Sequence, residues 1–125
     1  MLIRSASGLR GIAKDHFTPE LIDKYISAFI NTQNIKSCVI GRDGRPSGKQ
    51  IALWVIDSLH KKGVNIDNCG LATTPTMQIM TEKENYDGGI VITASHNPSE
   101  YNGLKFLQND GTFLSPEQCE ELFKA

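Results

Sequence analysis

The stretch GGIVIT, residues 88–93, decides how the chain folds. Its core, Ile90-Val91-Ile92, is apolar and β-branched at every position, and such side chains favour extended backbone. A strand without polar alternation is buried on both faces, so this stretch predicts a central strand of a sheet. The small and polar residues that follow, TASHNP at 93–98, indicate a loop at the carboxyl end of that strand. Functional groups gather at such positions in α/β sheets.

Helices and further strands are predicted on both sides of this strand. The helix starts combine an N-cap residue with a following proline or glutamine. They are Thr18 with Pro19, Ser47 with Gln50 as a capping box, Thr73 with Pro75, and Ser115 with Gln118. The corresponding helices cover residues 18–31, 47–63, 77–83 and 115–125. Shorter apolar runs predict strands at residues 37–40, 69–72 and 104–107.

Strands that alternate with helices indicate an α/β fold with helices on both faces of the sheet. We expect a three-layer α/β/α domain with a mostly parallel, mixed four-stranded sheet. A turn at residues 109–111 is expected to place the strand at 104–107 antiparallel at an edge. The 125 residues suit one domain, residues 1–125. Because the last helix runs into the chain's end, we expect this domain to be part of a longer protein.

The composition excludes several classes of partner. A net charge of −1 gives no bulk attraction to nucleic acid or to an anionic membrane. No apolar run approaches the roughly 18 residues of a membrane span, and the first residues lack a signal peptide's apolar stretch. Cys38, Cys69 and Cys119 form no C-x-x-C pair, so neither a disulfide framework nor a zinc site is predicted. We expect a cytoplasmic protein without nucleic-acid or membrane partners.

Ser95 is the candidate nucleophile, because it follows the central strand by two residues. Many serines in such loops have no catalytic role, so its neighbours matter. His96 could donate to a phosphate or relay a proton, or simply hydrogen-bond the backbone. Asn97-Pro98 restricts the loop backbone, and Lys105 supplies a positive charge shortly after it. Adjacent Ser and His rarely face each other and no G-x-S-x-G elbow is present, so a hydrolase triad is not indicated.

Three motifs together resemble the α-D-phosphohexomutases, the superfamily of phosphoglucomutase, phosphomannomutase and phosphoglucosamine mutase. They are SGLRG at residues 7–11, GRDGR at 41–45, and TASHNP at 93–98 followed by YNGLK at 101–105. Their order and approximate spacing also agree, so the resemblance spans nearly the whole chain. The serine motif with N-G-x-K is highly specific, whereas G-R-D-G-R alone is weak. The resemblance implies the N-terminal domain I of such an enzyme.

The resemblance also implies roles for individual residues. Ser95 matches the serine that carries a phosphate in the resting enzyme and exchanges it with the substrate. His96 and Asn97 match residues that flank this phosphoserine. Lys105 and Arg10 match basic residues that line the active site and assist the transfer. For residues 42–45 we expect only structural support, from a turn with internal Asp–Arg pairing.

The implied cofactors and partners lie largely outside this chain. The resemblance implies a hexose phosphate substrate, a hexose 1,6-bisphosphate intermediate and Mg²⁺. The family's metal loop is rich in aspartate and belongs to a second domain, so Mg²⁺ is expected to meet this chain only through the phosphate on Ser95. The remaining domains of the same polypeptide are the expected partners, and the isolated chain is expected to be inactive. The serine motif is common to glucose, mannose and glucosamine enzymes, so it leaves the hexose open.

Two other classes of function stay open. One is a non-catalytic phosphate- or nucleotide-binding module that uses helix N-termini. Such a module calls for a fingerprint such as G-x-G-x-x-G or G-x-x-x-x-G-K-[ST], and neither occurs here. The other is a regulatory or interaction domain whose serine no longer reacts. Phosphate labelling of Ser95 would separate the enzyme from both.

Overall fold

A computed structural model describes residues 2–5, 8–94 and 97–124 of the chain. These residues form a six-stranded sheet in the order β1-β2-β6-β5-β3-β4. The strands are β1 (Ile3–Ser5), β2 (Gly8–Ile12), β3 (Ser37–Arg42), β4 (Asn65–Leu71), β5 (Gly88–Ile92) and β6 (Tyr101–Leu107). The helices are α1 (Ala13–His16), α2 (Pro19–Gln33), α3 (Gly48–Lys61), α4 (Thr74–Lys83) and α5 (Pro116–Phe123).

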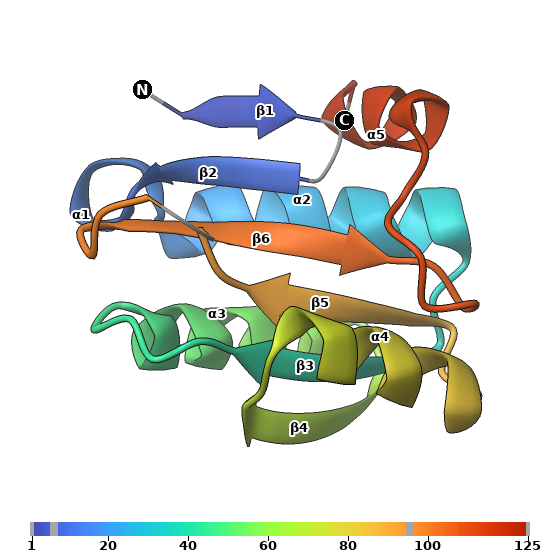
Figure 1. The fold of residues 1–125 in the computed structure, drawn as a ribbon. Coiled ribbons are helices and arrows are strands. Elements are labelled where there is room, and N and C mark those ends of the chain that lie inside the picture. Colours follow the sequence, from blue (N-terminus) through green and yellow to red (C-terminus); the bar gives the residue numbers. More distant parts are fainter. Residues whose placement is uncertain (1, 6–7, 95–96, 125) are drawn as a thin grey trace.

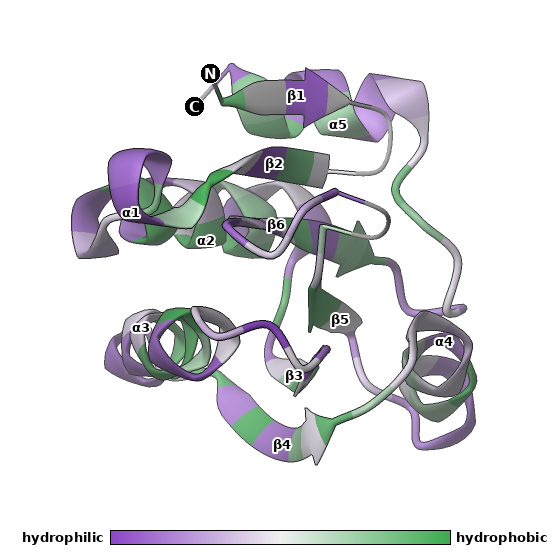
Figure 2. Ribbon diagram, turned by 60° about the vertical axis from the view of Figure 1, so that its left-hand side comes forward, coloured by the Kyte–Doolittle hydropathy of each residue, from purple (hydrophilic) through white to green (hydrophobic). Residues whose placement is uncertain are grey.

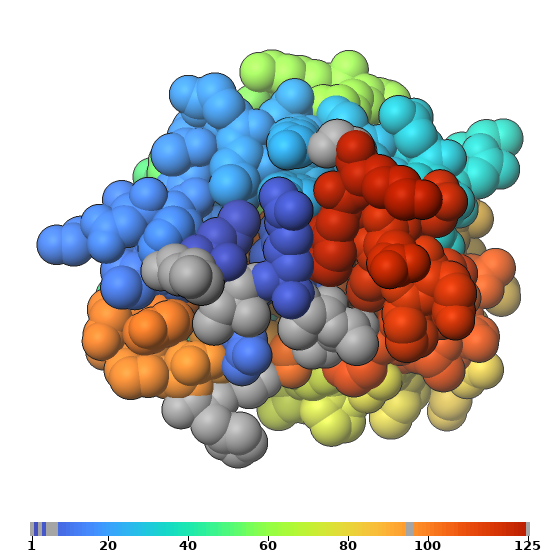
Figure 3. All heavy atoms as spheres, turned by 90° about the horizontal axis from the view of Figure 1, so that it is seen from above, coloured from blue at the N-terminus to red at the C-terminus, as the bar shows by residue number. Residues whose placement is uncertain are grey.

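Helices cover both faces of the sheet, which confirms the predicted three-layer α/β/α architecture (Figure 1). Helices α2 and α3 pack against each other on one face, and α4 packs against β3 and β5 on the opposite face. Helix α5 packs against α2 and lies beside β1 (Figures 1 and 3). The guanidinium carbon of Arg4 in β1 lies 5.8 Å from the centre of the Phe123 ring in α5.

Strand β5 is the central strand that its sequence predicts, and it is buried along its whole length. Ile90 and Ile92 pack into the main apolar cluster beneath α2 and α3. Val91, on the other face, packs into a smaller cluster beneath α4. The buried residues of α2 are all apolar, as are most of those of α3, and the outward sides of these helices are largely polar (Figure 2). Helices on both faces of the sheet therefore bury β5 completely.

The sheet differs from the prediction in strand number and direction. All four predicted strands are present, as β3 to β6, but β1 and β2 extend the sheet beyond them. Within the described residues, β3 pairs in parallel with β4 and β5, whereas β1–β2, β2–β6 and β5–β6 are antiparallel. Strand β6 therefore lies inside the sheet and not at its edge. The sequence of β2, GLRGI, has two glycines and an arginine, residues that give no strand signal.

Three of the four predicted N-caps accept a hydrogen bond from the helix that they precede; they are Thr18, Thr73 and Ser115. The predicted capping box of Ser47 and Gln50 is wrong. The backbone of Ser47 is already helical, and its side chain makes no cap hydrogen bond. Instead, Asn102 Nδ2 donates to Ser47 Oγ at 2.9 Å. This hydroxyl therefore joins the start of α3 to β6, a contact that local sequence does not reveal.

Two features bear on membrane spans and on the chemistry of the cysteines. Among the residues that the structure describes, no helix is both long and apolar enough to cross a membrane. Cys38 and Cys119 are buried and Cys69 is half-buried, and burial raises the pKa of all three thiols. Thiols held protonated in this way act as small apolar side chains rather than nucleophiles.

Candidate functional site

The described residues of the serine motif lie at one end of the sheet, called here the serine edge, where the ends of four strands come together. Because β3 and β5 are parallel, their carboxyl ends share this edge, and the antiparallel β6 begins there. Strand β2, antiparallel to β6, ends there (Figure 1, left side). Thr93, Ala94, Asn97 and Pro98 follow β5 at this edge. Ser95, and with it His96, belongs to the same loop in sequence but lies outside the described residues.

Arg10 and Lys105 lie on the same face of the sheet. Their neighbours Leu9 and Leu104 pair across β2 and β6 and both pack into the cluster beneath α2. Because side chains alternate along a strand, Arg10 and Lys105 face the opposite side. On that side α4 packs against β3 and β5 rather than against β2. Two cations therefore lie together on a face of the sheet next to the predicted serine loop.

Arg10 connects β2 to the serine loop. Its Nη1 donates to Oδ1 of Asn97 at 3.1 Å, although the two residues are 87 positions apart in sequence. Its Nε is buried and has no hydrogen-bond partner within the described part of the chain. A buried donor without an acceptor costs about 1–3 kcal/mol, so this nitrogen suits an incoming oxygen acceptor. Arg10 and Asn97, both predicted from sequence, are thus brought into contact.

The amine of Lys105 is held in surroundings that disfavour its charge. Burial, and secondarily the positive charge of Arg10, lower the pKa of Lys105 below its ordinary value. Its Nζ also lies 5.5 Å from the centre of the Phe113 ring, within cation–π range. A nearby anion would favour the charged amine and offset this penalty. The position therefore suits a bound phosphate.

Replacing Arg10 with methionine is expected to raise the pKa of Lys105, because a neighbouring positive charge is removed. Between the folded and unfolded pKa values of Lys105, the unfolded chain binds more protons, so stability rises with pH across that window. In the R10M variant, the pH range between the folded and unfolded pKa values of Lys105 should be narrower. NMR titration of isotopically labelled lysine side chains would measure the shift. Lys61, which pairs with Asp57 on the surface, is the internal control; equal titration of Lys105 in both proteins would contradict the prediction.

Asp43 and Arg45 bind residues on both sides of Ser95 and His96. Asp43 Oδ2 accepts a hydrogen bond from Thr93 Oγ1 at 2.6 Å and pairs with Arg45 Nε at 3.1 Å. Arg45 Nη1 donates to the carbonyl oxygens of Pro98 at 2.6 Å and Tyr101 at 3.2 Å. The predicted Asp–Arg pairing is confirmed. Its reach to residues more than 50 positions away is a contact that the sequence pattern does not contain.

Asn102 and Gly103 bring the start of β6 close to its neighbours. Asn102 is buried; its amide donates to Ser47, and its Oδ1 accepts the backbone N–H of Gly103 at 2.9 Å. A Cβ atom on Gly103 would lie 2.3 Å from the carbonyl oxygen of Leu9 and 2.8 Å from that of Thr93. Glycine is therefore required where β2, β6 and the serine loop converge, which gives the N-G-x-K motif a structural reason.

Comparison with known proteins identifies the family of this domain. Residues 1–125 match the family described as phosphoglucomutase/phosphomannomutase, alpha/beta/alpha domain I. The chain belongs to this family. The placement of Arg10 and Lys105 beside the serine motif thus occurs within a phosphohexomutase domain I.

Relatives of this domain I are named as mutases of several hexose phosphates. A phosphoglucomutase/phosphomannomutase of Thermococcus kodakarensis is 42% identical over 124 residues, covering 93% of this chain and 27% of its own length. A phosphoglucosamine mutase of Methanococcus aeolicus is 43% identical over 115 residues, covering 92% and 25%. The chain therefore spans about a quarter of the length of these relatives.

A solved structure has the same fold. The crystal structure of a protein described as a phosphomannomutase, from Thermus thermophilus, aligns with a TM-score of 0.88 at 24% sequence identity. The alignment covers 97% of this chain and 29% of the other. At this identity the likeness establishes the fold of the phosphohexomutase domain.

Metal ligands are not gathered in the described part of this domain. No group of three or more His, Cys, Asp and Glu side chains among those residues could hold a metal ion. Asp43, the carboxylate at the serine edge, is already engaged with Thr93 and Arg45. These residues do not fit a Mg²⁺ site on their own, so no step is assigned to a metal here. That Mg²⁺ meets this chain only through a phosphate on Ser95 stays a prediction.

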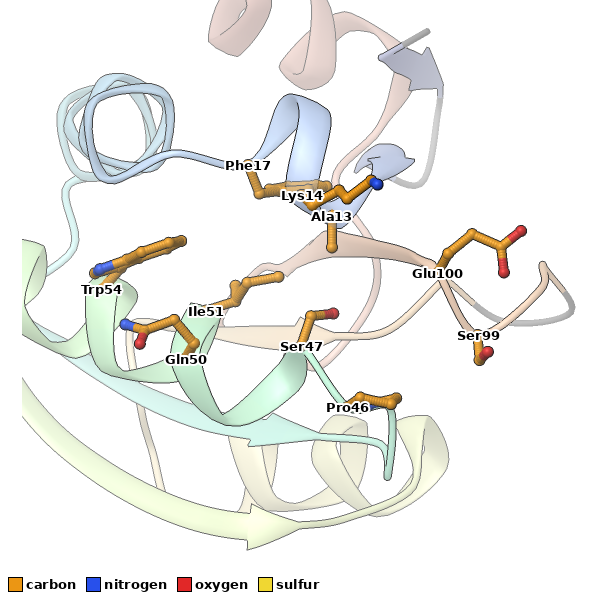
Figure 4. Close-up of a pocket in the computed structure, with 10 residues that line it drawn as sticks. All are labelled: Ala13, Lys14, Phe17, Pro46, Ser47, Gln50, Ile51, Trp54, Ser99 and Glu100. Atoms are coloured by element: carbon orange, nitrogen blue, oxygen red, sulfur yellow. The ribbon is translucent and has the colours of Figure 1, made fainter.

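An apolar hollow of about 460 Å³ lies beside the serine edge (Figure 4). Most of its wall is carbon, contributed by Ala13, Phe17, Pro46, Ile51 and Trp54. Such a wall offers few hydrogen-bond donors to a phosphate, which would lose its hydration on entry. Polar groups at the serine edge border a second hollow, of about 380 Å³, that Asp43, Arg45 and Asn97 help to line. Asn97 connects this second hollow to Arg10, which donates a hydrogen bond to it.

Proposed function

We propose that this chain is the phosphate-carrying domain of a hexose-phosphate mutase, with Ser95 as the residue that carries the phosphate. The enzyme interconverts hexose 1- and 6-phosphates through a hexose 1,6-bisphosphate. His96 and Asn97 flank the phosphoserine, and Arg10 and Lys105 bind and neutralise the transferring group.

One observation carries this proposal: two cations, Arg10 on β2 and Lys105 on β6, lie close enough to interact beside the serine loop, and Arg10 contacts that loop. Arg10 contacts Asn97, the second residue after Ser95 in sequence. Arg10 also keeps a buried N–H without a partner among the described residues, and Lys105 has a lowered pKa. Both features are unfavourable in the absence of an anion, and both would be relieved by a phosphate. An anion site is the simplest physical reason for this arrangement.

The reaction is a displacement at phosphorus. A hydroxyl of the hexose phosphate attacks the phosphorus, its P–O bond forms, and the bond between phosphorus and Ser95 Oγ breaks. The proton of the attacking hydroxyl ends on the released Ser95 oxygen. Phosphoryl transfer depends mainly on positioning and on neutralising charge over the phosphoryl oxygens. A phosphoserine adds about −1.5 to −2 charges, which Arg10 and Lys105 counter.

The remaining parts of the machinery come from outside this chain. We propose that domains of the same polypeptide supply the ligands of Mg²⁺, which when bound would neutralise charge on the transferring phosphate. They would also contribute the contacts that select the hexose. The isolated chain is therefore expected to lack mutase activity. Interconversion of hexose 1- and 6-phosphates by the purified 125-residue chain at enzymatic rates would contradict this expectation.

Intact-mass analysis followed by peptide mapping tests the proposed function. We expect a phosphate-sized increase in mass that maps to Ser95. Incubation with a hexose monophosphate, in the presence of the remaining domains, should remove this phosphate and yield a hexose bisphosphate. Absence of phosphate on Ser95 in the full-length protein, both before and after treatment with hexose 1,6-bisphosphate, would contradict the proposal. That result would favour a binding or regulatory module.

A further inference from the structure

We propose that Asp43 and Arg45 are positioning residues that fix the loop bearing Ser95 for phosphoryl transfer. The inference rests on the function proposed above and adds to it. Neither residue has to touch the substrate, because both act through the loop. Their role is to hold the backbone on the two sides of Ser95 and His96 in one relative position.

The carboxylate of Asp43 is the centre of this arrangement. It accepts a hydrogen bond from the hydroxyl of Thr93, two residues before Ser95, and forms an ion pair with the guanidinium of Arg45. The backbone N–H of Asp43 donates to the carbonyl of Ile92 at 3.1 Å, so Asp43 is itself attached to the end of β5. Its Oδ1 accepts the backbone N–H of Arg45 at 3.2 Å, which closes the turn after β3. Asp43 is thus anchored to the strand that leads into the loop.

Arg45 holds the far side of the same loop. Its Nη1 donates to the carbonyl of Pro98 and to that of Tyr101, the first residue of β6. The Arg45 side chain is only 11% exposed, so these hydrogen bonds compete little with water. A guanidinium is planar and presents several donors in fixed directions, so one side chain can meet a carboxylate and two carbonyls. Lysine carries the same charge but lacks this fork.

The pair therefore links the two ends of the loop. Thr93 lies at the start of the loop and hydrogen-bonds to Asp43. Pro98 and Tyr101 lie at its end and accept hydrogen bonds from Arg45. The ion pair between Asp43 and Arg45 connects the two ends. In addition, the N–H of Asn97 donates to the carbonyl of Ala94 at 3.1 Å, across Ser95 and His96. Transfer between two oxygens requires alignment within fractions of an ångström, and misplacement by about 1 Å can cost about 100-fold in rate. We therefore expect loss of the pair to act mainly on kcat and less on the free energy of unfolding.

Matched substitutions in the full-length protein test this role. Asp43→Asn removes the charge but keeps the shape, and Asp57→Asn makes the same change in the exposed pair with Lys61. Thr93→Val removes the hydroxyl that reaches Asp43, and Thr93→Ser retains it. For D43N and T93V we expect kcat to fall about 10- to 100-fold with KM changed less than about threefold. D57N and T93S should stay within about threefold of the unaltered protein in both.

Two outcomes overturn the inference in distinguishable ways. If the unaltered protein transfers phosphate through Ser95 but D43N has the kinetics of D57N, Asp43 is not a positioning residue and the proposed function stands. If the unaltered protein neither carries nor transfers phosphate, the proposed function fails and the positioning role fails with it. Arg45→Lys adds a second readout. It should show the same selective loss of kcat, with a phosphate occupancy on Ser95 equal to that of the unaltered protein after treatment with bisphosphate.

Discussion

Replacing Ser95 with alanine is expected to abolish phosphate incorporation and to lower mutase turnover by more than about a thousand-fold. The variant lacks the oxygen that forms the phosphate ester, and neighbouring cations cannot replace a nucleophile. The loss should therefore appear in kcat, while binding of hexose monophosphate changes little. Phosphate incorporation from hexose 1,6-bisphosphate and the rate of hexose 1- to 6-phosphate conversion would measure it in the full-length protein.

Ser99 provides the matched control for this prediction. It belongs to the same loop, is exposed, and lies four residues after Ser95. Ser99→Ala should keep both phosphate incorporation and turnover within about threefold of the unaltered protein. Turnover of the S95A variant comparable to that of S99A would show that the phosphate is carried elsewhere.

The parts of the fold that local sequence specifies were predictable. Strand β5 is apolar at each central position, and Ser115 with Gln118 forms both hydrogen bonds of the predicted capping box. Each of these signals is contained within a few neighbouring residues. The sequence of β2 does not predict a strand, because GLRGI is stabilised by pairing with β6, about 90 residues later in the chain. The cap predicted at Ser47 is wrong because its hydroxyl accepts a hydrogen bond from Asn102 and none from its own helix.

Some features of the candidate site follow from sequence motifs, and others appear only in the folded chain. Arg10, Asn97 and Lys105 were identifiable because they belong to motifs of a known superfamily, although only the folded sheet brings Arg10 to Asn97. The connection from Asp43 and Arg45 to the serine loop was not predictable from residues 41–45. It depends on β3 and β5 being parallel neighbours, which places their following loops side by side. A pattern within one loop can show its internal pairing but not which distant carbonyls it reaches.

Gly103 is the position at which a single methyl group is expected to do most damage to the fold. The added Cβ of a Gly103→Ala variant would lie 2.3 Å from the Leu9 carbonyl oxygen and 2.8 Å from that of Thr93. Both are backbone atoms, so neither can rotate away as a flexible side chain would. Relief requires β2 to separate from β6, which breaks the ladder where Arg10 pairs with Gly103. We expect a loss of at least about 3 kcal/mol in the free energy of unfolding.

Gly44→Ala is the control for this prediction, because no atom lies within 4 Å of a Cβ placed there. Its stability should stay within about 0.5 kcal/mol of the unaltered chain in denaturant unfolding. If G103A also unfolds within about 1 kcal/mol of the unaltered chain, the close approach of β2 and β6 is not as tight as described. If the loss is as large as expected, activity gives a second test. In the full-length protein, G103A that remains folded at low temperature should also lose transfer rate, because the same shift separates Arg10 from Asn97 in the serine loop.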